Sequence, residues 1–237
     1  MVRLFVFKSR YKRPYTGKLD SNRILMEHKI VSFFHKNLNP EIVELQKKVF
    51  DKLGINIIQQ EFEGTHGNAI KTFLESNSWD LITLFDVDCI PLDFDIINKI
   101  LRFVDDNTIY GNAQVSNSFP YAAPSFLSFT KNLYHSSPHK NFEGMYYPNM
   151  EGIHVEADCA EVFVKENLRI GKKQILSYPT KVIEPKWKYD SNTEYESFVY
   201  GNGTFFDNNT FHCFQIRLPE AQSTFIKFVK DFLNEKN

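Results

Sequence analysis

The first half of the chain alternates short apolar runs with segments of helical periodicity, and this alternation limits the fold more than any other feature. The apolar runs are rich in β-branched and aromatic residues, which indicates buried strands. Strands are expected at 29–35, 55–60, 80–88 and 108–115, with helices between them at 39–54, 67–77 and 93–104. Because the connections are short, the pattern predicts a parallel sheet flanked by helices.

The second half is less regular, and fewer elements are expected there. Segment 116–154 is rich in turn-forming and aromatic residues, which predicts loops with a short helix near 124–134. The other expected elements are a helix at 156–167, strands at 174–183 and 211–217, and a C-terminal helix from Pro219.

The composition excludes several classes of protein. A chain of 237 residues with 42% hydrophobic residues suits one globular domain, and a net charge of -1 gives no general affinity for nucleic acid. No apolar run reaches the roughly 18 to 20 residues of a membrane span, and the N-terminus does not have the pattern of a signal peptide. The cysteines Cys89, Cys159 and Cys213 lack CxxC spacing, which indicates reduced thiols and a cytoplasmic location.

The first 25 residues carry an excess of positive charge over the single acid Asp20. The basic residues are Arg3, Lys8, Arg10, Lys12, Arg13, Lys18 and Arg23. This pattern is typical of a solvated arm or an extra strand. It also fits a contact surface for a phosphate-rich ligand or for a membrane, which would be a peripheral contact.

Two acids follow the apolar run in "LITLFDVDCIPLD" (81–93). Because side chains at i and i+2 of a strand point to the same side, Asp86 and Asp88 can present two carboxylates in one direction. Close carboxylates repel unless a cation or a proton lies between them, and Mg²⁺ or Mn²⁺ prefers such oxygen ligands. The residues alone leave three alternatives open: a metal site, a nucleophile or a simple turn.

Two segments resemble GT-A fold glycosyltransferases. "WDLITLFDVDCIPL" is similar to their DxD segment, and "GNGTFFDNNTFHCFQIR" (201–217) is similar to the C-terminal segment in which many of them place a histidine on the metal. The resemblance implies an α/β, GT-A (Rossmann-like) fold in which a mixed, mainly parallel sheet flanked by helices forms a single domain, 26–237. Its nucleotide-sugar half would be about 26–115, and its acceptor and metal-closing half about 116–237.

The resemblance also implies an activity: transfer of a sugar from a UDP- or GDP-type sugar donor to a hydroxyl of a glycan, lipid or protein acceptor. The cofactor would be Mn²⁺ or Mg²⁺. Asp88 would bind the metal directly, Asp86 would assist it or contact the donor, and His212 would be a further ligand. Asp158 would be the base that takes the acceptor's proton. An acid at the start of a helix is explained equally well by the helix dipole, and both inverting and retaining chemistry stay open.

Further contacts are implied by position in the same family. Phe34, His35 and His66 fall where the family holds the nucleotide, and Asn112 and Gln114 fall where it meets the sugar and the acceptor. An aromatic platform for the acceptor is expected from Trp187, Tyr146 and Tyr147. Core or surface packing explains each of these aromatic residues and histidines equally well.

Three other functions are alternatives to sugar transfer. A haloacid-dehalogenase-like phosphatase also ends an apolar strand in Asp-x-Asp and would use Asp86 as its nucleophile, but its motif normally lies on the first strand and gives His212 no role. A sugar-nucleotide-binding module without turnover would have no need of Asp86, Asp88 and His212 together. Nucleic-acid binding lacks the basic face that it requires.

Overall fold

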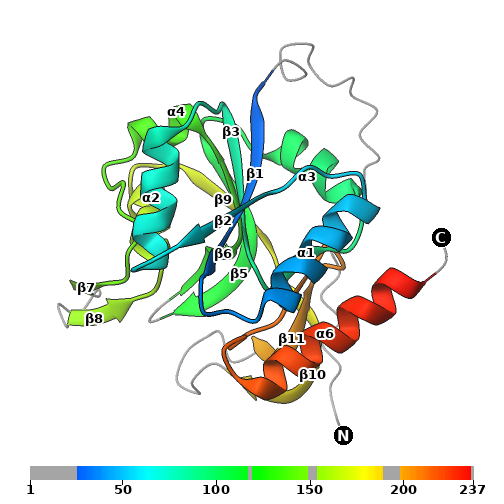
Figure 1. Ribbon diagram of the computed structural model, residues 1–237. Coiled ribbons are helices and arrows are strands. Elements are labelled where there is room, and N and C mark those ends of the chain that lie inside the picture. The colour runs from blue at the N-terminus through cyan, green and yellow to red at the C-terminus, as the bar shows by residue number, and fades with distance from the viewer. Residues whose placement is uncertain (1–25, 117–118, 149–153, 189–197, 236–237) are drawn as a thin grey trace, which may run out of the picture.

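Six strands form the central sheet of the computed structural model, which describes residues 26–116, 119–148, 154–188 and 198–235 (Figure 1). The strand order is β2-β1-β3-β6-β5-β9. The strands are β1 (His28–His35), β2 (Ile58–Phe62), β3 (Leu81–Asp86), β5 (Thr108–Ser116), β6 (Phe119–Thr130) and β9 (Lys173–Ser177). Only β6 is antiparallel to its neighbours in this sheet, so the sheet is mixed and mainly parallel, as expected.

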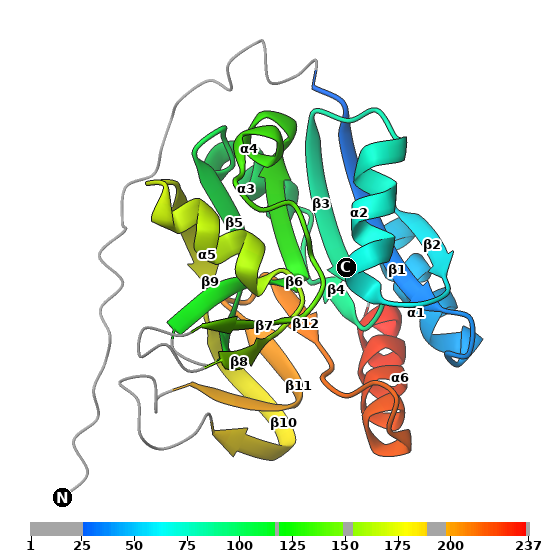
Figure 2. The same ribbon diagram turned by 90° about the vertical axis from the view of Figure 1, so that its left-hand side faces the viewer.

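Helices cover both faces of this sheet. One face carries α2 (His66–Ser76), α4 (Lys131–Ser136) and α5 (Glu161–Arg169), and the other carries α1 (Pro40–Lys52) and α3 (Asp95–Phe103) (Figures 1 and 2). The sequence accounts for where α1 and α2 begin. Asn39 accepts a hydrogen bond from the backbone N–H of Glu41, and Thr65 accepts one from that of Asn68, which satisfies N–H groups that the helices leave unpaired.

A second sheet lies beyond the carboxyl end of β3 (Figure 2). Its order is β10-β11-β12-β4, and its strands are β10 (Pro179–Lys188), β11 (Val199–Phe206), β12 (Thr210–His212) and β4 (Cys89–Pro91). Helix α6 (Pro219–Asn234) packs on α1 and on this sheet through one apolar cluster. A short hairpin pairs β7 (Met145–Pro148) with β8 (His154–Ala157).

The prediction of loops at 116–154 is wrong for its first part, where β6 forms a central strand. Pro120 and Pro124 suggested a loop because proline cannot donate a ladder hydrogen bond. The pairing of β6 with β3 extends only from Phe126 to Thr130, so both prolines lie beyond the end of β3. On the other side, Pro124 falls at a bulge, where the register of β6 with β5 shifts. The expected helix near 124–134 is α4, which begins at Lys131.

Other boundaries also differ from the expectation. The strand expected at 174–183 is two strands in different sheets, because the chain leaves β9 at Ser177 and starts β10 at Pro179. The strand expected at 211–217 ends at His212. The helix expected from 156 starts at Glu161, because β8 occupies the residues up to Ala157. Strand β2 starts at Ile58, three residues later than expected.

The helices of the described ranges include none with both the length and the apolar character that crossing a bilayer requires. The basic segment 1–25 lies outside the described residues, so the expectation of an arm or an extra strand stays untested.

The central position of β6 gives a test of the fold. Phe129 is fully buried and its ring contacts those of Trp79, Phe142 and Phe163, whereas Phe94 is 47% exposed. We expect Phe129→Ala to lower the free energy of unfolding by about 3 to 5 kcal/mol through the cavity it creates. Phe94→Ala is the control, with a change of about 0.5 kcal/mol or less. Equal effects in urea unfolding would contradict the placement of β6 in the core.

Candidate functional site

Asp86 and Asp88 stand where the chain passes from the first sheet to the second. Asp86 is the last residue of β3, and a two-residue turn at Val87 and Asp88 leads into β4 at Cys89. Val87 packs in the apolar cluster of α1 and α6, which anchors the middle of the turn. The carboxyl end of β3 therefore presents both aspartates at the junction of the two sheets.

His212 reaches the aspartates through strand pairing. Strand β12 is antiparallel to β4, with His212 opposite Cys89, and the backbone N–H of Cys213 donates to the Asp88 carbonyl at 2.9 Å. The histidine is thus adjacent to the Asp86–Asp88 turn although 124 positions (212 minus 88) separate it from Asp88 in the sequence.

The glycine-rich run before His212 has a packing role. Gly203 lies in β11, and a Cβ atom at this position would come within 2.6 Å of the ring of Phe211, which precedes His212. A larger residue would push Phe211 and its strand away from β11. Gly203 in the "GNGTFF" run is therefore explained by close packing beside the histidine.

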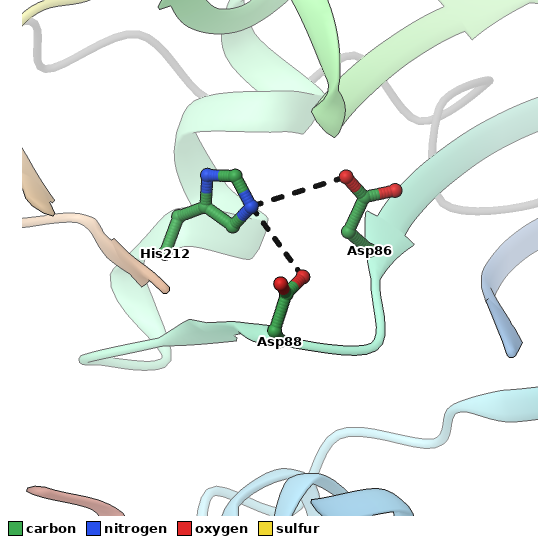
Figure 3. Close-up of side chains that lie close together, drawn as sticks. All are labelled: Asp86, Asp88 and His212. Atoms are coloured by element: carbon green, nitrogen blue, oxygen red, sulfur yellow. Dashed lines mark ion pairs between the residues drawn. The ribbon is translucent and has the colours of Figure 1, made fainter. Parts of the chain in front are cut away.

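The three side chains form one cluster (Figure 3). His212 Nε2 lies 3.4 Å from Asp88 Oδ1 and 3.9 Å from Asp86 Oδ2, and one ligand atom from each residue falls within 4.8 Å of the others. The side chains of Asp88 and His212 are 8% and 6% exposed, and that of Asp86 is 26% exposed. The cluster is therefore sheltered, with Asp86 as its most accessible member.

The electrostatics of the cluster favour a positive partner for the carboxylates. Burial is the largest influence on Asp86 and raises its pKa, and the charge of Asp88 raises it further, while His66 and His212 act in the opposite direction. Burial by itself lowers the pKa of His212, but Asp88 and Asp86 together outweigh burial and the pKa is raised. Without a metal, a protonated His212 would serve as the cation of the cluster.

The donor set suits a divalent metal ion. Carboxylate oxygens are the ligands of Mg²⁺ and Mn²⁺, and an imidazole nitrogen is compatible with Mn²⁺. Nδ1 of His212 is buried and has no hydrogen-bond partner among the described residues. Nε2 is the ring nitrogen that faces both aspartates. Asp86, Asp88 and His212 could therefore hold a metal ion.

A cavity of about 570 Å³ opens over the cluster. Its wall includes Asp158, Gln114 and the loop 214–218 between β12 and α6. Asp158 Oδ2 accepts a hydrogen bond from Gln114 Nε2 at 2.7 Å, and its Oδ1 accepts one from the backbone N–H of Cys159 at 2.7 Å. Arg217, an exposed residue, also lines this cavity.

A second cavity, of about 520 Å³, shares Asp158 with the first. It lies between the start of α2, including His66, and segments 143–144 and 156–159. His66 stacks on Phe62, and its Nε2 lies 3.6 Å from Asp86 Oδ1. Glu143 and Glu156 add carboxylates to this cavity. The structure thus places His66 between Asp86 and the second cavity.

Several predicted contact residues lie away from both cavities. Asn112 is fully buried and accepts a hydrogen bond from Thr210 Oγ1 at 2.9 Å, so it joins β5 to β12 instead of lining the site. Phe34 packs at the edge of the α1–α6 cluster, and His35 meets Phe62 edge-on. Trp187 packs edge-on against Phe214, a residue of the first cavity. The side chains of Tyr146 and Tyr147 lie outside the described residues.

Two residues near the cluster were missed in the sequence. Arg217 is the last residue of the segment 201–217 that contains His212. Because it is far from the aspartates along the chain, the sequence did not indicate that it lines the same cavity. Gln46 is a buried polar residue on the apolar face of α1, and its side chain donates to the Asp86 carbonyl at 2.8 Å. A polar residue in the middle of an apolar helix face was the signal that could have identified it.

Comparison with known proteins does not assign the chain to a family. No protein-family model matches the sequence, and no curated protein matches it. A search of solved structures found similarity to the crystal structure of A197 from STIV, with 8% sequence identity, a TM-score of 0.42, and coverage of 78% of this chain and 93% of that chain. This similarity is too distant to support an argument about fold family or function.

The raised pKa of His212 predicts how metal binding depends on pH. Below that pKa an entering ion must displace the imidazole proton, so Mn²⁺ affinity should rise about tenfold per pH unit and level off once His212 is neutral. Titration of Mn²⁺ by electron paramagnetic resonance from pH 5.5 to 8.5, a range of about three units around the usual histidine pKa, measures this. His212→Ala should bind more weakly and show a shallower slope, and the remaining pH dependence should come from Asp86, whose pKa is also raised. An unchanged slope in that variant would contradict the prediction.

Proposed function

We propose that this protein is a metal-dependent glycosyltransferase of GT-A type, which transfers a sugar from a nucleoside diphosphate sugar to an acceptor hydroxyl. The observation that carries the proposal is the Asp86–Asp88–His212 cluster at the carboxyl end of β3, at the floor of an open cavity. In α/β sheets, ligands bind at the carboxyl ends of the strands. The mixed, mainly parallel sheet with helices on both faces is compatible with this assignment.

The proposed division of roles follows from the geometry. Asp88 and His212 are the more buried members and would hold Mn²⁺ or Mg²⁺, which when bound neutralises the diphosphate leaving group. Asp86 is more exposed and faces His66, so it would support the metal and contact the donor. Arg217, on the cavity wall, would pair with the diphosphate through charge-assisted hydrogen bonds.

Asp158 is the carboxylate best placed to take a proton from the acceptor. It lines both cavities, and Gln114 and the backbone N–H of Cys159 fix the direction of its two oxygens. A base held at the boundary of two cavities suits a reaction with two substrates. The donor would occupy the cavity with Arg217, and the acceptor would approach from the cavity with Glu143 and Glu156, which lacks Lys and Arg among its described wall residues.

A conservative change at Asp88 tests the metal site. Asp88→Asn removes one negative charge and keeps the shape, so we expect loss of Mn²⁺-dependent UDP- or GDP-sugar binding with a folded protein. Calorimetry with and without Mn²⁺ measures binding, and circular dichroism measures folding. Asp51→Asn is the matched control, because Asp51 is an exposed acid of α1 that pairs with Lys47. Unchanged Mn²⁺-dependent binding in Asp88→Asn would refute the proposed metal site.

An assay of sugar release distinguishes a glycosyltransferase from a phosphatase and from a binding module. We expect sugar release from a panel of UDP- and GDP-sugars only when Mn²⁺ or Mg²⁺ is present, and stimulation of that release by an acceptor. A covalent phosphate on Asp86, trapped with a phosphate analogue, would instead identify a phosphatase. Binding of a sugar nucleotide without any turnover across glycan, lipid and peptide acceptors would identify a binding module.

The Arg217 guanidinium gives a second test, at the diphosphate. Arg217→Ala should weaken binding of the free nucleoside diphosphate about ten- to a hundredfold, because a hydrogen bond to a charged group contributes about 1.5 to 3 kcal/mol. Mn²⁺ affinity without nucleotide should stay as in the wild type. Arg169→Ala, at an exposed arginine of α5, is the control. Equal nucleotide affinity in the two variants would remove Arg217 from the site.

A further inference from the structure

We propose that Gln46 is a positioning residue that holds the Asp86–Asp88 turn in the geometry required for metal binding. This inference rests on the proposed function, because it concerns the metal site of that function. Gln46 lies on α1, forty positions before Asp86, and touches neither the cavity nor the carboxylate oxygens of the cluster. Its role is therefore exerted through the backbone of the turn.

The placement of Gln46 is unusual for an amide side chain. It is fully buried, on the helix face that also carries the buried residues Ile42, Val49 and Phe50. A side-chain amide in such surroundings is unfavourable unless its donors and acceptor are all satisfied. A leucine or methionine would fill this position at no such cost, so the polar atoms call for an explanation.

The hydrogen bonds of Gln46 converge on the turn. Nε2 donates to the carbonyl oxygen of Asp86 at 2.8 Å and to that of Cys89 at 3.0 Å, so the two amide hydrogens bracket Val87 and Asp88. Oε1 accepts from Gln59 Nε2 at 3.0 Å, and Gln59 also donates to the Val43 carbonyl at 2.8 Å. Gln59, on β2, thereby fixes the orientation of the Gln46 amide.

These bonds determine where the Asp88 carboxylate points. Gln46 holds the carbonyls of Asp86 and Cys89 from the side of α1, and the backbone N–H of Cys213 holds the Asp88 carbonyl from β12. The turn is thus fixed from two sides, between the helix and the strand that ends in His212. Without the Gln46 amide, two carbonyls lose a partner and the turn can rotate, which would widen the gap between Asp88 and His212.

A buried amide that only stabilises the fold should not affect metal binding. Asn167 provides the comparison, because it is also a fully buried helix amide that donates two hydrogen bonds, to Ser137 Oγ and to the Phe163 carbonyl, both at 2.8 Å. It lies in α5, and neither of these two hydrogen bonds reaches the cluster. Replacing either amide should lower thermal stability, but only a change at Gln46 should change the affinity for metal.

Gln46→Met, which keeps the length of the side chain and removes its donors, is the principal variant. We expect its Mn²⁺ affinity, measured by electron paramagnetic resonance well below its unfolding temperature, to fall about tenfold or more. Gln46→Glu should lose less, because a buried carboxyl that keeps its proton still donates one of the two bonds. Asn167→Leu should bind Mn²⁺ as the wild type does, even where its unfolding temperature drops as far as that of Gln46→Met.

The outcomes separate this inference from the proposed function. Wild-type affinity in Gln46→Met, or equal weakening in Gln46→Met and Asn167→Leu, would overturn the positioning role while leaving a metal site that depends on Asp88. If the wild type itself fails to bind Mn²⁺, both the metal site and the role of Gln46 are overturned. Should Gln46→Met fail to fold, Gln46→Glu decides alone: affinity equal to that of the wild type contradicts the inference.

Discussion

The pairing of β4 with β12 is the interaction on which the rest of the site depends. Each strand has only three residues, yet together they join the turn after β3 to the segment that ends in His212. Helix α6 and helix α1 pack over this junction through one apolar cluster. The burial of apolar surface therefore stabilises a strand pairing that three residue pairs could not stabilise alone. The position of His212 beside Asp88 is therefore a consequence of the tertiary core.

Two carboxylates and an imidazole held close together are costly unless a charge balances them. Burial raises the pKa of Asp86 and lowers that of His212, but the neighbouring acids raise both, so the carboxylates favour a proton or another cation in the cluster. A metal ion and a proton would compete for the same place. A bound ion would relieve the repulsion between the carboxylates, so under the proposed function the geometry of the cluster, and the residues that hold it, would set the affinity.

The sequence pattern predicted those strands and helices whose formation depends on local apolar periodicity and on capping residues. Strands β1, β3 and β5 and helices α1, α2, α3 and α6 follow from apolar periodicity and capping, and all were expected close to their observed bounds. Strand β6 was missed because Pro120 and Pro124 obscure it, and only its register with β3 and β5 shows why they are tolerated. The Asp–Asp–His grouping was expected from resemblance, but the burial of Asn112 depends on contacts between distant segments, which no local pattern reveals.

The dependence of β4 on β12 has a consequence for how the protein is made. Within the described residues β4 pairs with β12 alone. Until residue 212 has emerged from the ribosome, the growing chain therefore carries both aspartates, and β4 has no partner strand. The first sheet can form its β1, β2 and β3 pairings well before that point. Synthesis therefore separates the two events in time: these first pairings can form early, and the Asp86–Asp88–His212 cluster is completed only after residue 212 has been made.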